Sequence, residues 1–204
     1  MPVPVLVWAL GALALAAAGI GAAVVLDQAV GKSILLIGPR EAGKTTLRNF
    51  LIDGVITKIY VQTTFTEQAS AKVQDQTLKS YKLRVTDVDG GRDQYSEWKK
   101  HAEDADCICF VVDASRLDEE IYASGALLRA KQVQRWPARD GQRRLLLLTH
   151  IDQLAGAGER DITENLSVVA LAMALEPTRT LTANLLNEAE MQHAVWTILK
   201  VLND

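Results

Sequence analysis

A loop near residue 40 has the residue types and the spacing that bind a phosphate chain. Gly38, Gly43, Lys44 and Thr45 match the pattern G-x-x-x-x-G-K-[ST] between an apolar run and a helix-like stretch. Backbone N–H groups of such a loop converge on phosphates at the start of a helix. We expect Lys44 to contact the β- and γ-phosphates, and the Thr45 hydroxyl to ligate Mg²⁺. The expected nucleotide-binding residues here are Gly38, Pro39, Arg40, Glu41, Ala42, Gly43, Lys44, Thr45 and Thr46.

A second pattern, D-x-x-G, lies 43 residues after Lys44. Asp87-Val88-Asp89-Gly90 follows Tyr81–Thr86, a stretch whose side chains alternate as they do in an exposed edge strand. The aspartate of this pattern holds Mg²⁺ through water, and the glycine N–H can touch a γ-phosphate. We therefore expect Asp87 to bind the metal and Gly90 to bind the nucleotide.

Two later stretches indicate which base the site reads. Thr149-His150-Ile151-Asp152 follows the apolar run Arg144–Leu148 and is similar to the guanine-reading pattern [NT]-K-x-D. A carboxylate at Asp152 accepts hydrogen bonds from guanine N1–H and the 2-amino group, which adenine does not offer. Thr182-Ala183-Asn184 is similar to an S-A-K loop, in which a backbone N–H contacts the guanine oxygen. The alternative for Thr149–Asp152 is an ordinary turn at the end of a strand.

The elements that position these residues alternate between strands and helices. Short β-rich apolar runs predict strands, and longer stretches predict helices over residues 45–53, 93–104, 117–135, 159–175 and 185–203. This order predicts an α/β fold with a mostly parallel sheet and helices on both faces. Ligands of such sheets bind at the carboxyl ends of the strands, where each motif above is found.

Residues 3–26 form an uncharged and almost wholly apolar segment. As a helix, these 24 residues would be roughly 36 Å long, enough to span a hydrocarbon core of about 30 Å. We predict a transmembrane helix over residues 1–26, a juxtamembrane stretch over 27–30 and one domain over 31–204. The alternatives are a cleaved signal peptide, for which a basic amino-terminal region is missing, and a buried helix, for which the run is long.

Composition excludes several classes of protein. Hydrophobic residues make up 49% of the 204 residues, which supports a folded core and rules out disorder as the main state. The net charge of −3 lacks the basic excess of dedicated nucleic-acid binders, so we expect no direct nucleic-acid partner. Two cysteines are too few for a disulfide scaffold. Cys107 and Cys109 share one face of a strand and are expected in the core.

The order of these motifs resembles the small Ras-superfamily GTPases over roughly residues 31–204. Asp87-Val88-Asp89-Gly90-Gly91 is similar to the D-V-G-G-Q of their Arf branch. Because a membrane helix would join the domain directly, the chain is also similar to the β-subunits of signal recognition particle receptors. A prokaryotic membrane-anchored relative would show the same motifs. The resemblance implies a P-loop NTPase G domain that binds GTP or GDP with Mg²⁺ and recognises a protein partner through its switch regions.

The resemblance also implies a threonine ligand for Mg²⁺ in the stretch Gln62–Thr66, which is similar to the first switch region. Thr63 is the first candidate and Thr64 is the second, alongside Thr45 and Asp87. The alternative for this threonine-rich stretch is an exposed strand.

Three positions depart from the family pattern. Gly91 stands where many relatives have a water-orienting glutamine, so no side chain there can position the attacking water. Arg40 is either an internal arginine finger, catalytic together with Lys44, or a solvent-facing loop residue. His150 replaces a lysine that packs over the base, which predicts weaker affinity while Asp152 keeps the guanine preference.

These observations predict a membrane-anchored GTP-binding switch with slow intrinsic hydrolysis that recruits a protein partner. Residues 3–26 would contact lipid, and the G domain would face the cytosol, where GTP and Mg²⁺ are available. A constitutive receptor subunit that holds nucleotide with little turnover is the rival, and Asp152 argues against a third reading, a P-loop ATPase. A basic cluster either faces anionic lipid or forms a solvated helix face; it consists of Arg129, Lys131, Arg135, Arg139, Arg143 and Arg144.

Overall fold

The computed structural model describes residues 32–53, 56, 67–74, 80–87, 95–154 and 158–202. The predicted membrane segment and juxtamembrane stretch lie outside the described residues, as do Thr63, Thr64, Gly90 and Gly91. Among the helices that are described, none combines the length and the apolar composition needed to cross a bilayer.

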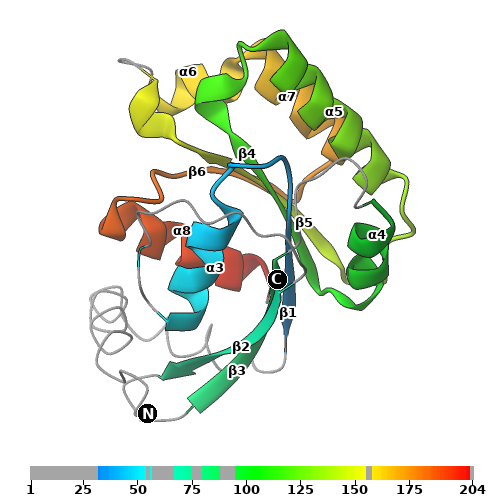
Figure 1. Ribbon diagram of the computed structural model, residues 1–204, viewed down its shortest axis with the longest axis vertical. Helices are drawn as coiled ribbons and strands as arrows, with labels where there is room; N and C mark the ends of the chain where they lie inside the picture. Colours follow the sequence, from blue (N-terminus) through cyan, green and yellow to red (C-terminus); the bar gives the residue numbers. More distant parts are fainter. Residues whose placement is uncertain are drawn as a thin grey trace.

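A six-stranded sheet forms the centre of the domain, with the strand order β2-β3-β1-β4-β5-β6 (Figure 1). The strands are β1 (Ser33–Ile37), β2 (Glu67–Gln74), β3 (Ser80–Asp87), β4 (Cys107–Asp113), β5 (Arg143–Thr149) and β6 (Arg179–Thr182). All neighbours pair in parallel except β2, which runs antiparallel to β3. The predicted mostly parallel sheet is confirmed, and five strands end at the same edge.

Helices cover both faces of this sheet, as predicted (Figure 1). The described helices are α3 (Lys44–Asp53), α4 (Tyr95–Asp104), α5 (Glu120–Gln134), α6 (Glu159–Glu164), α7 (Leu166–Leu175) and α8 (Glu188–Val201). Helices α3 and α8 pack on one face, and α4, α5, α6 and α7 pack on the other. The sequence of α5 explains why this helix packs on the sheet. Its buried residues recur at helical spacing and form one side that faces the core: Tyr122, Ala126, Ala130 and Val133.

The two cores follow from the alternation of side chains along β1. Ile34 and Leu36 join the core under α3 and α8, whereas Leu35 and Ile37 join the opposite core. Cys107 and Cys109 both lie fully buried in the first core, which confirms their predicted place. Burial raises the pKa of the Cys109 thiol to about 12 and raises that of Cys107 as well, so neither is poised as a nucleophile.

The prediction that residues 81–86 form an exposed edge strand is wrong. Strand β3 lies between β1 and β2, and Val85, Thr86 and Asp87 are buried. Strand β2, which the sequence patterns did not indicate, occupies the edge in place of β3. Its sequence, EQASAKVQ, contains one β-branched residue and no aromatic residue, so it has little of the composition that marks strands.

Several helix boundaries also differ from the predictions, and capping residues explain where α7 and α8 begin. The predicted helix over 159–175 is broken at Asn165, whose side chain accepts from the N–H of Ser167 at 2.9 Å and caps α7. Helix α8 begins after Asn187, whose side chain accepts from two backbone N–H groups. Helix α5 begins at Glu120, because residues 114–116 form a separate 3₁₀ turn, η2.

Candidate functional site

The phosphate-type loop joins the end of β1 to the start of α3, and two of its glycines are required by close approaches. Gly38 has φ 140°, and a Cβ there would lie 2.0 Å from the Val111 carbonyl oxygen. Gly43 has φ 87°, and a Cβ there would lie 2.7 Å from Leu185 Cδ1. The loop therefore packs directly against β4 and against the stretch that follows β6.

Glu41 is the non-glycine residue of this loop with a left-handed backbone, at φ 65°. Such a conformation costs an L-residue about 1–2 kcal/mol. Successive residues that alternate between right- and left-handed conformations turn their N–H groups toward one concavity, which binds anions. The shape of the loop thus suits the phosphate binding that its sequence predicted.

Lys44 lies at the end of the loop and is buried. Its Nζ donates to the Pro39 carbonyl oxygen at 2.7 Å and to the Gly38 carbonyl oxygen at 3.2 Å. Because Lys44 is also the first residue of α3, its charge stands at the helix end where N–H groups are exposed. Ammonium and N–H groups together make this point suitable for phosphate.

Thr45 and Asp87 meet at the same edge, as the metal prediction requires. The Thr45 hydroxyl donates to Asp87 Oδ2 at 2.8 Å, and Asp87 is fully buried at the end of β3. Mg²⁺ prefers oxygen ligands and is usually held by one or two carboxylates together with substrate phosphates. Within the described residues there is no cluster of three or more His, Cys, Asp or Glu side chains that could hold a metal alone. The donors present fit Mg²⁺ that binds together with a phosphate chain.

Thr149 connects the phosphate loop to the sheet. Its buried hydroxyl lies 3.0 Å from the Ala42 carbonyl oxygen, 3.1 Å from that of Val112 and 2.9 Å from His150 Nδ1. The structure thus brings the first residue of the predicted base-reading motif into contact with the loop.

His150 and Asp152 follow at the end of β5. His150 has a left-handed backbone, φ 54°, and its Nδ1 lies 3.6 Å from Asp113 Oδ1. Asp152 lies in the 3₁₀ turn η3 (Ile151–Gln153) and is exposed, so its carboxylate is accessible to a ligand. These positions are compatible with the roles predicted for them, which stay predictions.

The stretch after β6 is held by its own hydrogen bonds. The Ala183 N–H donates to the Leu148 carbonyl oxygen at 2.9 Å, and the Asn184 N–H donates to Glu190 Oε2 at 2.8 Å. A guanine oxygen would have to share one of these donors. Thr182, Ala183 and Asn184 do lie at the predicted edge, but the N–H contact to the base stays a prediction.

A polar group at the end of β4 was not predicted to have a role. Asp113 Oδ1 accepts from the Ser115 N–H at 2.9 Å and from its hydroxyl at 2.6 Å, which caps η2. The Tyr122 hydroxyl accepts from the Asp113 N–H at 2.9 Å, and burial raises the pKa of Tyr122. Arg116 follows and reaches Glu41 in the phosphate loop. An aspartate that ends a buried strand two residues before a serine was the available signal.

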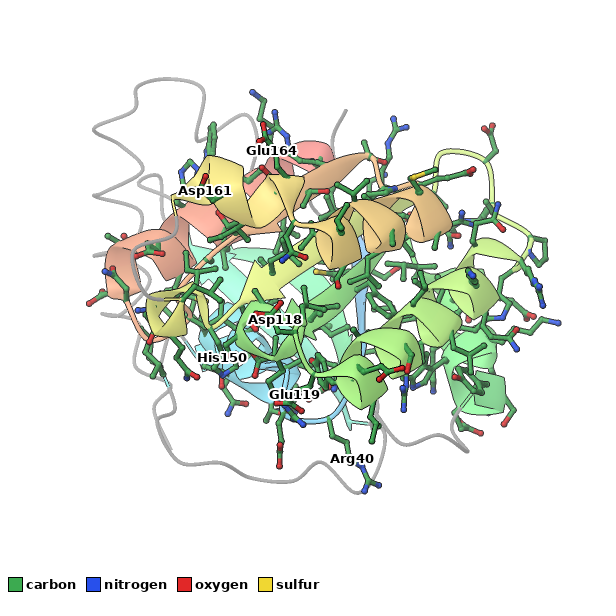
Figure 2. The ribbon with its side chains drawn as sticks, turned by 90° about the horizontal axis from the view of Figure 1, so that it is seen from above. Arg40, Asp118, Glu119, His150, Asp161 and Glu164 are labelled. Carbon is green, nitrogen blue, oxygen red and sulfur yellow. The ribbon has the colours of Figure 1, made fainter. Side chains whose placement is uncertain are left out.

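Arg40, the candidate arginine finger, is exposed. Figure 2 shows its side chain projecting away from the ribbon. This orientation agrees with the solvent-facing alternative for Arg40, and a catalytic role stays a prediction.

Three members of the basic cluster bind within the domain. Arg139 Nη2 lies 2.6 Å from Asp106 Oδ1, Arg144 Nη2 donates to the Trp136 carbonyl oxygen and Arg129 Nη1 donates to that of Gly125. These contacts show that the cluster partly serves the fold.

The domain has a mostly parallel sheet covered by helices. At one edge of this sheet, the phosphate loop contacts the buried Asp87 and the first residue of the motif predicted to read the base. These features define a P-loop nucleotide-binding protein. The chain belongs to the ADP-ribosylation factor family, whose model matches residues 23–200. It is therefore a small, Arf-like GTPase of the Ras superfamily, as its motifs predicted. Members of this family are GTP-binding regulatory switches that bind GTP or GDP with Mg²⁺ and contact protein effectors through their switch regions.

Proposed function

We propose that this chain is a membrane-anchored GTP-binding switch, which hydrolyses GTP slowly and recruits a protein partner to the membrane. The hydrogen bond from the Thr45 hydroxyl to Asp87 carries the nucleotide-binding part of the proposal. It brings two oxygen atoms that suit Mg²⁺ together beside the phosphate loop. A switch needs this arrangement, since the γ-phosphate and its metal hold the switch segments in the active state.

Different described residues would bind the phosphates, the metal ion and the base of GTP. Lys44 and the loop N–H groups hold the phosphates, and Thr45 and Asp87 would hold Mg²⁺. When bound, the metal ion neutralises charge on the β- and γ-phosphates. Asp152 reads the guanine edge, and Thr149 keeps the loop and the base side in register.

Slow turnover follows from Gly91, which lies outside the described residues. Phosphoryl transfer depends on a positioned water and on charge stabilisation, and a glycine provides no group to orient the water. Intrinsic small GTPases work at about 10⁻⁴ s⁻¹, and an arginine from a partner can add roughly 10³- to 10⁵-fold. The same glycine favours the second candidate, a constitutive nucleotide-bound receptor subunit with little turnover.

Single-turnover hydrolysis of GTP by the isolated protein separates these candidates. A switch predicts a rate at or below about 10⁻⁴ s⁻¹, which rises when Gly91→Gln restores the missing side chain. A rate above about 1 s⁻¹ without a partner, on the scale of stimulated GTPases, would refute slow turnover. No hydrolysis in either protein would favour the constitutive subunit.

The anchoring part of the proposal is supported by the apolar residues 3–26, which are separated from Ser33 by six residues. The similarity to signal recognition particle receptor β-subunits also supports the proposed membrane anchor. We expect the full chain to stay in membranes during carbonate extraction and its G domain to be digested by protease outside sealed cytosol-side-out vesicles. Release of the intact chain, or protection of residues 31–204, would contradict anchoring or orientation.

A further inference from the structure

We propose that Arg116 is a positioning residue for bound nucleotide, which holds Glu41 and so keeps the phosphate-binding loop in its binding conformation. This inference rests on the proposed binding of GTP at the loop. It assigns a role to a residue outside the loop, the metal site and the base-reading motifs.

The contact joins two segments that are 75 residues apart in the sequence. Arg116 Nη1 donates to Glu41 Oε2 at 3.2 Å, from the 3₁₀ turn that follows β4 to the phosphate loop. Glu41 is the loop residue with the left-handed backbone, so the ion pair acts at the point where the loop is strained. The neighbouring carbonyl of Ala42 is held from the other side by the Thr149 hydroxyl.

Contacts with other residues also hold the Arg116 side chain in place. Its Nε and Nη2 donate to the two carboxylate oxygens of Glu119, each at 3.0 Å, and its Cζ lies 4.5 Å from the centre of the Tyr122 ring. Tyr122 is anchored in turn by the N–H of Asp113. Figure 2 shows Glu119 near the start of α5.

This preorganisation is the reason to expect an effect from a partly exposed ion pair. An exposed pair usually contributes little, because ordering two long side chains offsets the attraction. Here the guanidinium is already ordered by Glu119 and Tyr122, so the contact with Glu41 loses less entropy. The ion pair thus favours the loop conformation whose N–H groups face the phosphates.

Nucleotide dissociation from the full-length protein in detergent tests the proposal. We expect Arg116→Met to speed the dissociation of fluorescent GDP by about threefold to tenfold, and Arg116→Lys to restore part of the loss. Arg135→Met is the matched control, because Arg135 is an exposed arginine at the other end of α5. The thermal midpoint of the nucleotide-free protein should fall by only a few degrees in Arg116→Met, because the contacts with Glu119 and Tyr122 are lost, and the faster dissociation should persist well below that temperature.

Glu41→Gln distinguishes positioning from simple neutralisation of a carboxylate near the phosphates. Positioning predicts that Glu41→Gln dissociates as fast as Arg116→Met, and that the double variant is no worse than either single one. It also predicts a smaller effect for Glu41→Gly, because glycine adopts the left-handed backbone without strain. Tighter binding by Glu41→Gln, or recovery in the double variant, would overturn the proposal.

The failure of this inference and that of the proposed function give different results. If the unaltered protein does not bind guanine nucleotide, the proposed function fails. If it binds GDP and Arg116→Met dissociates at the unaltered rate, only the role of Arg116 fails.

Discussion

Two residues of the site, Thr45 and Thr149, contact partners that are distant in the sequence. Thr149 is the first residue of the motif predicted to read the base, and its hydroxyl contacts the Ala42 carbonyl of the phosphate loop. Lys44 is fixed by carbonyl groups of its own loop, and Thr45 by the carboxylate at the end of β3. The chemistry of each residue was readable from its type and spacing, whereas its contacts depend on the sheet.

Replacing Lys44 tests the phosphate loop. Lys44→Ala removes a charge-assisted contact, and such contacts contribute about 1.5–3 kcal/mol, or roughly 10- to 150-fold in affinity. We expect a loss of this size in GTP and GDP affinity, measured by fluorescent nucleotide titration. Unchanged affinity would mean that the loop does not hold the phosphates.

Replacing Asp152 tests the reading of the base. Asp152→Asn substitutes an amide donor for one of the two acceptors that guanine needs, and xanthine offers an oxygen at that point. We expect weaker GTP binding and a new preference for xanthosine triphosphate in a competition assay. A variant that keeps the guanine preference of the unaltered protein would show that another group reads the base.

At the scale of elements, Asp106 joins the start of β1 to the segments before β4 and β5. Its Oδ2 accepts from the Ser33 N–H at 2.7 Å and from the Ser33 hydroxyl at 2.9 Å, and Arg139 lies at Oδ1. Burial opposes ionisation, but these hydrogen bonds and the Arg139 charge outweigh it, so the pKa of Asp106 lies below its ordinary value. Three connections on one edge of the sheet therefore depend on one carboxylate.

The lowered pKa of Asp106 predicts a pH-dependent contribution to stability. Because the folded state favours the charged form, the contribution is complete above the ordinary aspartate pKa of about 4 and is lost as pH falls below it. We expect Asp106→Asn to lower the free energy of unfolding by about 1–3 kcal/mol at pH 7. In urea titrations the gap between the two proteins should narrow below pH 4, and a constant gap would contradict the assignment.

Helix α7 illustrates how burial, not hydrophobicity, decides the effect of a substitution. Leu171 is 1% exposed and Leu166 is 86% exposed on the same helix. Leu171→Ala should cost about 2–5 kcal/mol of unfolding free energy, because it leaves a cavity. Leu166→Ala should change it by less than about 0.5 kcal/mol, and equal losses in urea titrations would show that α7 packs differently.

For the whole molecule, the strand-and-helix order and the edge where the motifs meet were predictable from the sequence. The buried runs such as CICFVVD are continuous, as parallel strands are, and the phosphate-loop pattern is specific. Strand β2 was missed because EQASAKVQ has weak strand preference and is placed by pairing with β3. The buried side of LSVVALAMAL was not predictable either, because this helix has almost no polar face. Arg116 was missed because its role depends on a contact across 75 residues.

We expect the edge formed by β1, β3, β5 and β6 to bind a guanine nucleotide. The most direct measurement is the affinity of the full-length protein for GTP and for ATP, each titrated in the presence of Mg²⁺. Sites that hydrogen-bond a substrate edge reject analogues strongly, so we predict at least about 100-fold tighter binding of GTP. Equal affinities for GTP and ATP would contradict guanine recognition at this edge.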